Sequence, residues 1–176
     1  MNKRFITFIF STVGLYLVWF VLYEFYLKPN GRLDHIITEN ISIATCYLLN
    51  LSDYNCYYTI GKHLGETYVF FGDNILPTVR IGSSCNGLEM LVLFAIFIIC
   101  YPGNVWLKLG YTTGGLLIIH ALNIFRNYIL ALLAYNESPS FDLFHRYLFI
   151  FLIYGVVFIL WVVWAKILSK LYLKHA

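Results

Sequence analysis

Long apolar intervals, separated by short polar segments, set the pattern of this chain. Intervals without an ionised side chain lie between Arg4 and Glu24, between Met90 and Lys108, and between Arg146 and Lys166. A helix of about 20 apolar residues crosses the hydrocarbon layer of a bilayer. The pattern therefore predicts membrane spans.

Four spans are expected within a single integral membrane domain over residues 1–176: 5–27, 85–101, 106–135 and 141–166. The first lacks a small-residue cleavage site and should remain as an anchor, ended by Lys28-Pro29-Asn30-Gly31-Arg32. The second is short, and it approaches the length of a span when its helix begins at Cys85. Glycines 110, 114 and 115 favour close helix contact in the third span.

The segment 28–84 contains charged residues and several glycines, unlike the long apolar intervals, and is expected to form an insertion outside the bilayer. Residues 33–51 alternate apolar and polar positions as an amphipathic helix lying at the membrane interface would. Two β-rich runs, 67–71 and 75–81, flank Gly72-Asp73-Asn74 and predict a hairpin. Pro77 makes the second run an edge strand or a bulged one.

Composition agrees with a membrane protein. Apolar residues make up 60% of the chain and charged residues 12%, which is far from the composition of a soluble domain. The predicted fold class is a membrane all-α protein with about four transmembrane helices, an interfacial amphipathic helix and a small extracytoplasmic β-hairpin. The aromatic residues are expected at the bilayer interfaces and on the lipid-facing surface. The net charge of +3 does not indicate a nucleic-acid partner.

The distribution of charge predicts the orientation of the chain. The N-terminal segment, the loop 102–108 and the C-terminal tail carry six basic residues and no acidic one: Lys3, Arg4, Lys108, Lys166, Lys170 and Lys174. The other side carries acidic and basic residues together. The positive-inside rule therefore places both termini in the cytoplasm and the insertion outside the cytoplasmic membrane.

The four cysteines, Cys46, Cys56, Cys85 and Cys100, form no CxxC pair and show no zinc-ligand spacing. No metal and no organic cofactor is implied. A Cys46–Cys56 disulfide is possible in an oxidising compartment, although two unpaired packing cysteines would also fit the sequence.

Cys85 stands where a polar segment meets an apolar run. Ser83 and Ser84 are typical helix-capping residues, so Cys85 is expected in or just before the first turn of the following helix. The unpaired amides and the helix dipole at that position favour a thiolate, which is the nucleophilic form of cysteine. A small apolar residue at a membrane boundary is the alternative interpretation of Cys85.

Arg126 lies within the third predicted span and His145 just inside the fourth, both towards the outer side. An arginine inside an apolar helix costs about 2.5–3.5 kcal/mol on insertion scales, so it should face the bundle or a wet cavity unless it snorkels to the headgroups. Asn123 shares its helix face and Asn127 follows it, which favours an inward-facing site. A thiolate, an imidazole and a guanidinium at one membrane face are the groups that acyl transfer needs.

Three blocks of the sequence resemble the signature blocks of the exosortase/archaeosortase family. They are Cys85-Asn86-Gly87-Leu88, Asn123-Ile124-Phe125-Arg126, and His145 followed by Gly155; the resemblance covers residues 36–165. It implies a membrane-embedded analogue of sortases that cleaves the C-terminal sorting signal of a membrane-tethered protein and transfers the new end to an unknown acceptor. Carried over, Cys85 is the nucleophile, Arg126 the oxyanion-stabilising cation and His145 the general acid/base.

The chain departs from the longer family members because one span precedes its insertion, and Asn86 stands where serine is common. It is similar to the short, stand-alone forms. Three further residues carry expectations. Glu89 is expected to orient His145 or to pair with Arg126. His120 is expected to be a packing residue, and Arg146 a headgroup anchor or else the cation in place of Arg126.

A non-enzymatic role is the competing interpretation. The chain could be an assembly partner for export of surface polysaccharide or protein, or a small transporter in which Arg126 binds an anion. A transporter of known architecture would show internal repeats and broken helices near the midplane. The sequence contains no repeat, and Gly114-Gly115 is the one possible break.

Overall fold

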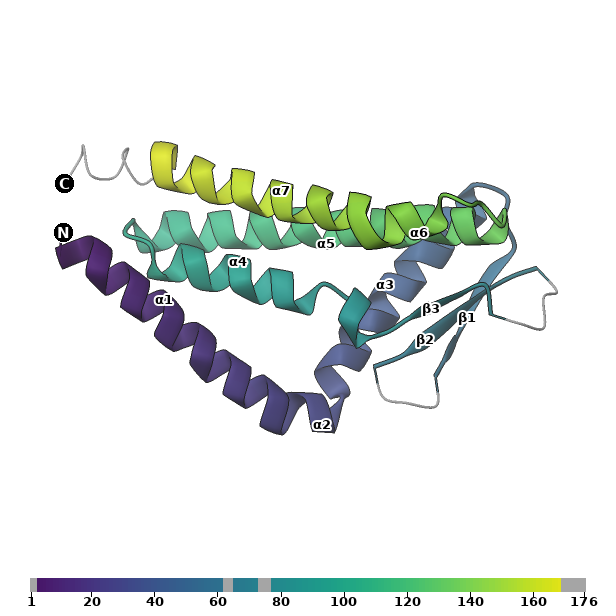
Figure 1. Cartoon of the computed structure of the whole chain (residues 1–176), viewed down its shortest axis with the longest axis horizontal. Coiled ribbons are helices and arrows are strands. Elements are labelled where there is room, and N and C mark those ends of the chain that lie inside the picture. Colours follow the sequence, from purple (N-terminus) through teal and green to yellow (C-terminus); the bar gives the residue numbers. More distant parts are fainter. Residues whose placement is uncertain (1–2, 62–64, 73–76, 169–176) are drawn as a thin grey trace.

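A computed structural model describes residues 3–61, 65–72 and 77–168 of the chain. Helices α4 (Leu88–Cys100), α5 (Val105–Tyr135) and α7 (Phe149–Val163) run side by side and form the helical bundle, whereas α1 (Lys3–Leu22) meets α4 near its own start and then diverges from it (Figure 1). A sheet lobe, made of α3 (Arg32–Leu51) and three strands, lies at one end. The start of α1 and the end of α7 lie at the opposite end (Figure 1).

Among the described residues, three helical segments are long and apolar enough to cross a membrane: Phe5–Asn30, Val105–Tyr135 and Phe141–Lys166. The last is built from α6 (Phe141–Leu143), a π-helical turn at Phe144–Leu148, α7 and a second π-helical turn at Trp164–Leu168. They coincide with the first, third and fourth predicted spans. Helix α4 has 13 residues and rises about 20 Å, short of the ~30 Å hydrocarbon layer.

The first helical segment ends later than its sequence predicts. A π-helical turn at Tyr23–Leu27 leads into α2 (Lys28–Asn30), and the helix stops at Gly31, whose φ is 62°. Pro29 is tolerated because it stands in the first turn of α2, where a backbone N–H is not required. The helix therefore ends within the predicted segment Lys28–Arg32, but Gly31 supplies the stop and the expected break at Pro29 is wrong.

The sheet has three antiparallel strands in the order β1 (Cys56–Ile60), β2 (Thr67–Phe71) and β3 (Val79–Ile81). Strand β2 is the first predicted run, whereas β3 is only the last three residues of the second, after Pro77. The predicted turn residues Asp73 and Asn74 lie outside the described residues. The sequence analysis missed β1, because its pattern does not alternate and Cys56 is its one buried side chain.

Helix α3 is amphipathic, but its buried face carries polar as well as apolar side chains. It crosses α5 and packs on the sheet, and its buried face includes the polar residues Asp34, Thr38, Ser42 and Thr45. Large apolar side chains, including Ile36, Ile43, Tyr47 and Leu51, are exposed on it. A disulfide joins Cys46 of α3 to Cys56 of β1, so of the two arrangements that the sequence allowed, the bridged one is present.

The helical bundle has a separate, apolar core built from Phe94, Ile98, Ile119, Val157 and Trp164. Gly115 of α5 touches the Phe94 ring of α4 so closely that a Cβ would not fit, which confirms close helix contact at this glycine. Among the described residues, a Cβ at Gly110 or Gly114 would meet no atom of another helix within 4 Å, so the prediction of close packing is wrong for these two.

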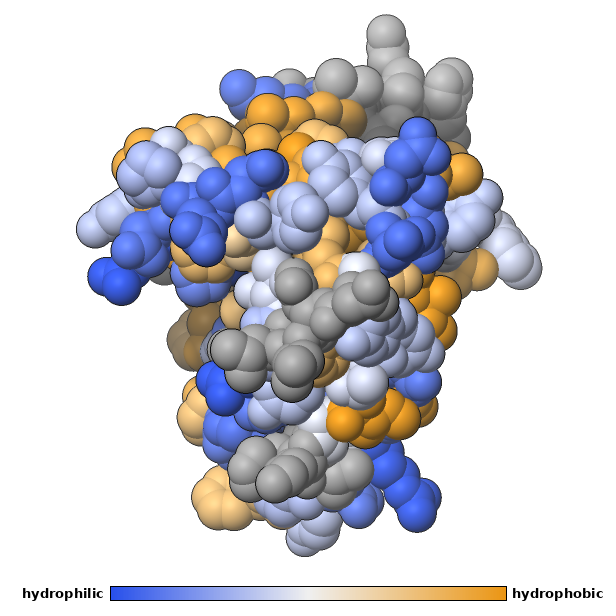
Figure 2. Space-filling model, turned by 90° about the vertical axis from the view of Figure 1, so that its right-hand side faces the viewer, coloured by the Kyte–Doolittle hydropathy of each residue, from blue (hydrophilic) through white to orange (hydrophobic). Residues whose placement is uncertain are grey.

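The surface changes character along the molecule. Viewed from the end that carries the sheet, many hydrophilic side chains face the viewer, with apolar patches between them (Figure 2). The flanks of α1 and α7 instead expose large apolar side chains such as Phe10, Val18, Phe151 and Phe158. This distribution is typical of helices in lipid below a lobe that meets water.

Candidate functional site

Cys85 closes a 3-10 turn, Ser83–Cys85, between β3 and α4, and its side chain is half-buried. Helix α4 begins at Leu88, so Cys85 lies just before its first turn, and the helix starts three residues later than the predicted span 85–101. The N-cap residue is Gly87, with φ 74° and no capping side chain, whereas Asn86 Oδ1 accepts a hydrogen bond from the Leu88 N–H at 2.9 Å. Asn86 thus supplies a side-chain hydrogen bond to the start of the helix.

Helix α5 holds this turn from one side. Asn123, which is 2% exposed, donates from Nδ2 to the Cys85 carbonyl at 3.3 Å. The backbone carbonyl of Asn123 accepts from Asn127 Nδ2 at 2.8 Å. A Cβ on Gly87 would lie 3.0 Å from Asn123 Nδ2. The predicted supporting residue Asn123 therefore contacts the segment that carries Cys85.

Helix α3 also contacts the segment that carries Cys85, through Asn86. Asn86, 1% exposed, donates from Nδ2 to Asp34 Oδ1 at 2.8 Å, and the Tyr23 hydroxyl lies 3.1 Å from each oxygen of the same carboxyl group. The sequence analysis missed Asp34 and gave Asn86 no role. The one signal in the sequence was the four-residue spacing of Asp34, Thr38 and Ser42, which places these polar residues on one helix face.

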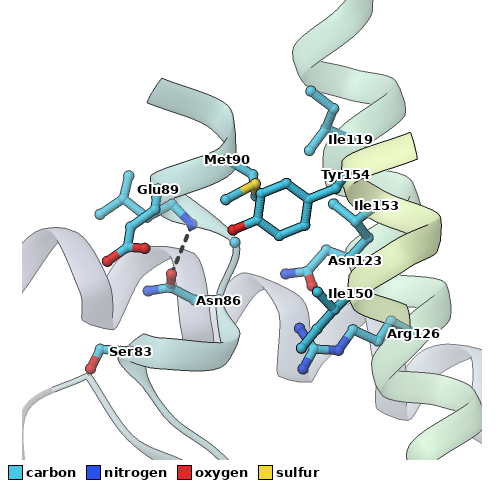
Figure 3. A pocket seen from close by; sticks show the side chains of 12 residues that line it. Ser83, Asn86, Glu89, Met90, Ile119, Asn123, Arg126, Ile150, Ile153 and Tyr154 are labelled. Carbon is cyan, nitrogen blue, oxygen red and sulfur yellow. Dashed lines mark hydrogen bonds between the residues drawn. The ribbon is translucent and has the colours of Figure 1, made fainter. Parts of the chain in front are cut away.

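A cavity of about 220 Å³ lies between the start of α4, α5 and α7. Polar lining residues include Asn86, Glu89, Asn123, Arg126 and Tyr154, and the remaining wall is largely aliphatic (Figure 3). Arg126 is half-buried and lines the cavity, and its Nε and Asn123 Oδ1 have no hydrogen-bond partner within the described residues. A half-buried guanidinium whose Nε is buried, beside an amide oxygen without a partner, suits a polar or anionic group of a bound molecule.

His145 lies in the π-helical turn near the start of the fourth predicted span, where it is half-buried and stacks on Phe141 at 5.7 Å between ring centroids. Arg126 lies one helical turn from Asn123 on α5, and Asn123 contacts the Cys85 turn. Cys85 and His145 are absent from the described lining of the cavity.

The remaining candidates occupy distinct places. Glu89 lines the cavity on the side opposite Arg126, and among the described residues no ion pair joins the two (Figure 3). Arg146 is exposed and lies 3.8 Å from Asp142, one helical turn away. His120 shares a 2.9 Å hydrogen bond with Asn40 and so links α5 to α3, as a packing histidine would.

A family model described as transmembrane exosortase matches residues 3–165. No curated protein and no solved structure matches the chain. The match covers nearly the whole sequence, including the apolar helices, the Cys85 turn, Arg126 and His145. Because a match of this extent shows the family, the chain belongs to the transmembrane exosortases.

Proposed function

We propose that the protein is a membrane-embedded cysteine transpeptidase or protease that cleaves C-terminal sorting signals of surface or exported proteins. Membership of the exosortase family suggests a membrane transpeptidase. The observation that carries the residue assignment is the Asn123 contact with the Cys85 carbonyl, which brings the cysteine turn against the helix that carries Arg126.

In this proposal, Cys85 Sγ attacks the scissile carbonyl while His145 accepts the thiol proton. Arg126 stabilises the oxyanion of the tetrahedral intermediate, and His145 returns the proton to the leaving amine as the thioester forms. An acceptor amine or water then attacks the thioester and releases Cys85. The substrate's own transmembrane segment would lie beside the enzyme in the bilayer, which raises the local concentration of the scissile bond.

The proposed topology has four spans, both termini in the cytoplasm and the sheet lobe outside. Three observations support it. The loop charges follow the positive-inside rule. Helix α4 starts beside the sheet lobe and ends where Lys108 Nζ donates to the Ile99 carbonyl, so the chain returns to the end where α1 starts. The Cys46–Cys56 disulfide suits an oxidising compartment.

The test compares cells that express the parent protein, Cys85→Ala or Cys100→Ser. C-terminal peptides of surface proteins are sequenced by mass spectrometry, with hydroxylamine added as a competing nucleophile. The proposal predicts new C-termini, some of them hydroxamates, with the parent and with Cys100→Ser, and their loss with Cys85→Ala. Unchanged C-termini in Cys85→Ala would favour the non-enzymatic assembly partner.

A further inference from the structure

Asp34 occupies a junction of three chain segments. It lies in the first turn of α3 and is 2% exposed, and its carboxyl group meets Tyr23 from the first apolar helix and Asn86 from the Cys85 turn. We propose that Asp34 is a positioning residue for Cys85 and acts through the side chain of Asn86. This inference rests on the proposed role of Cys85 as the nucleophile.

The Asn86 amide is held at both ends. Its Nδ2 donates to Asp34 at 2.8 Å and its Oδ1 accepts from the Leu88 N–H at 2.9 Å. A flipped amide would place a donor against a donor at one end and an acceptor against an acceptor at the other. Because Asn86 follows Cys85 directly, a single amide orientation fixes the path of the chain from the cysteine to the start of α4.

Loss of the Asp34 carboxyl would leave Asn86 Nδ2 buried without its acceptor. A buried polar group without a partner is unfavourable enough to move towards water or to take another conformation. The contact between Asn123 and the Cys85 carbonyl is longer, at 3.3 Å, and comes from α5 rather than α3. We therefore expect the turn to loosen on the side of α3 and to expose the half-buried thiol more often.

The experiment uses the full chain carrying Cys100→Ser, reconstituted in liposomes, so that Cys85 is the reporting thiol while Cys46 and Cys56 remain bridged. The rate of alkylation by iodoacetamide is measured over a pH series. Asp34→Ala should raise this rate about fivefold, which is the scale of one buried hydrogen bond. The pH of half-maximal rate should shift in the same direction in Asp34→Ala and Asn86→Ala.

Two variants separate positioning from general loosening of α3. Asp34→Asn keeps an oxygen that can accept from Asn86, so its rate should stay within about twofold of the parent rate. Thr38→Val alters the same buried face one turn further along, at a hydroxyl without a hydrogen-bond partner among the described residues, and should match the parent. Asp34→Ser keeps a polar group too short to reach Asn86, and it replaces Asp34→Ala if that variant does not fold.

A double-mutant cycle tests whether the effect of Asp34 on Cys85 passes through Asn86. Asp34→Ala added to Asn86→Ala should cause no further change in rate, because the proposed effect passes through Asn86. The inference is overturned if Asp34→Ala behaves as Thr38→Val does, or if its full effect persists in the Asn86→Ala background. Alkylation of Cys85 does not depend on turnover. The alkylation result therefore tests the positioning role of Asp34 separately from the proposed catalytic role of Cys85.

Discussion

The sheet lobe and the helical bundle bury different kinds of side chain. The bundle core is apolar and aromatic, with Phe94, Ile98, Ile119, Val157 and Trp164. The sheet lobe, the Cys85 turn and the part of α5 that contacts this turn bury polar residues beside their apolar ones: Asp34, Thr38, Ser42, Thr45, Thr67, Asn86, Asn123 and Asn127. Apolar packing is not directional, whereas hydrogen bonds fix orientation. The bundle can therefore supply stability while the polar junction sets the geometry around Cys85.

The strongest test of this contrast is Phe94→Ala. Phe94 is fully buried against Gly115, and we expect its truncation to leave a cavity and to lower the free energy of unfolding by about 3–5 kcal/mol. Denaturation in mixed micelles measures the loss. The alkylation rate of Cys85 should stay close to the parent value under native conditions, and a large change in that rate would contradict the separation of roles.

The second-largest loss of stability is expected from removal of the Cys46–Cys56 disulfide. Replacing Cys46 and Cys56 by serine opens a loop of sequence separation 10, and we expect a loss of about 2–3 kcal/mol. Thermal unfolding with and without a reductant measures it. The parent should become less stable in the reductant and the double variant should not respond. Cys100→Ser, which leaves the bridge intact, is the control.

Gly87 tests the contact between the Cys85 turn and α5. Alanine there would adopt φ 74° and would crowd Asn123, so we expect a loss of about 1–3 kcal/mol together with a changed alkylation rate at Cys85. Gly72→Ala is the matched control, because Gly72 also has a positive φ but open space at its Cβ. Equal losses in the two variants would remove the argument that Asn123 fills the space beside Gly87.

Arg146 should show the smallest effect on stability. It is exposed, and its 3.8 Å contact with Asp142 is an ion pair of the kind that contributes little. We expect Arg146→Gln to change the free energy of unfolding by less than about 0.5 kcal/mol and to leave processing intact. Arg126→Gln should abolish processing. The reverse pattern would identify Arg146 as the catalytic cation, the alternative that the sequence left open.

The apolar helices could be predicted from the sequence because each is a long run whose pattern is local. The start of α4 could not, because the serines before Cys85 are good capping residues and Asn86 supplies the hydrogen bond instead. The contact between Asp34 and Asn86 joins residues 52 positions apart, and no local periodicity encodes such a pair. Candidate residues in the site were therefore accessible to sequence reasoning, whereas the contacts that hold them were not.

The most direct test of the central claim is a search for a covalent adduct on Cys85. Protein isolated from cells after rapid acid quenching is digested and analysed by mass spectrometry, with and without hydroxylamine treatment. The account predicts a peptide joined to Cys85 by a thioester that hydroxylamine removes, and no such adduct on Cys100. Processing of surface proteins that continues while Cys85 is unmodified, and that survives Cys85→Ala, would contradict it.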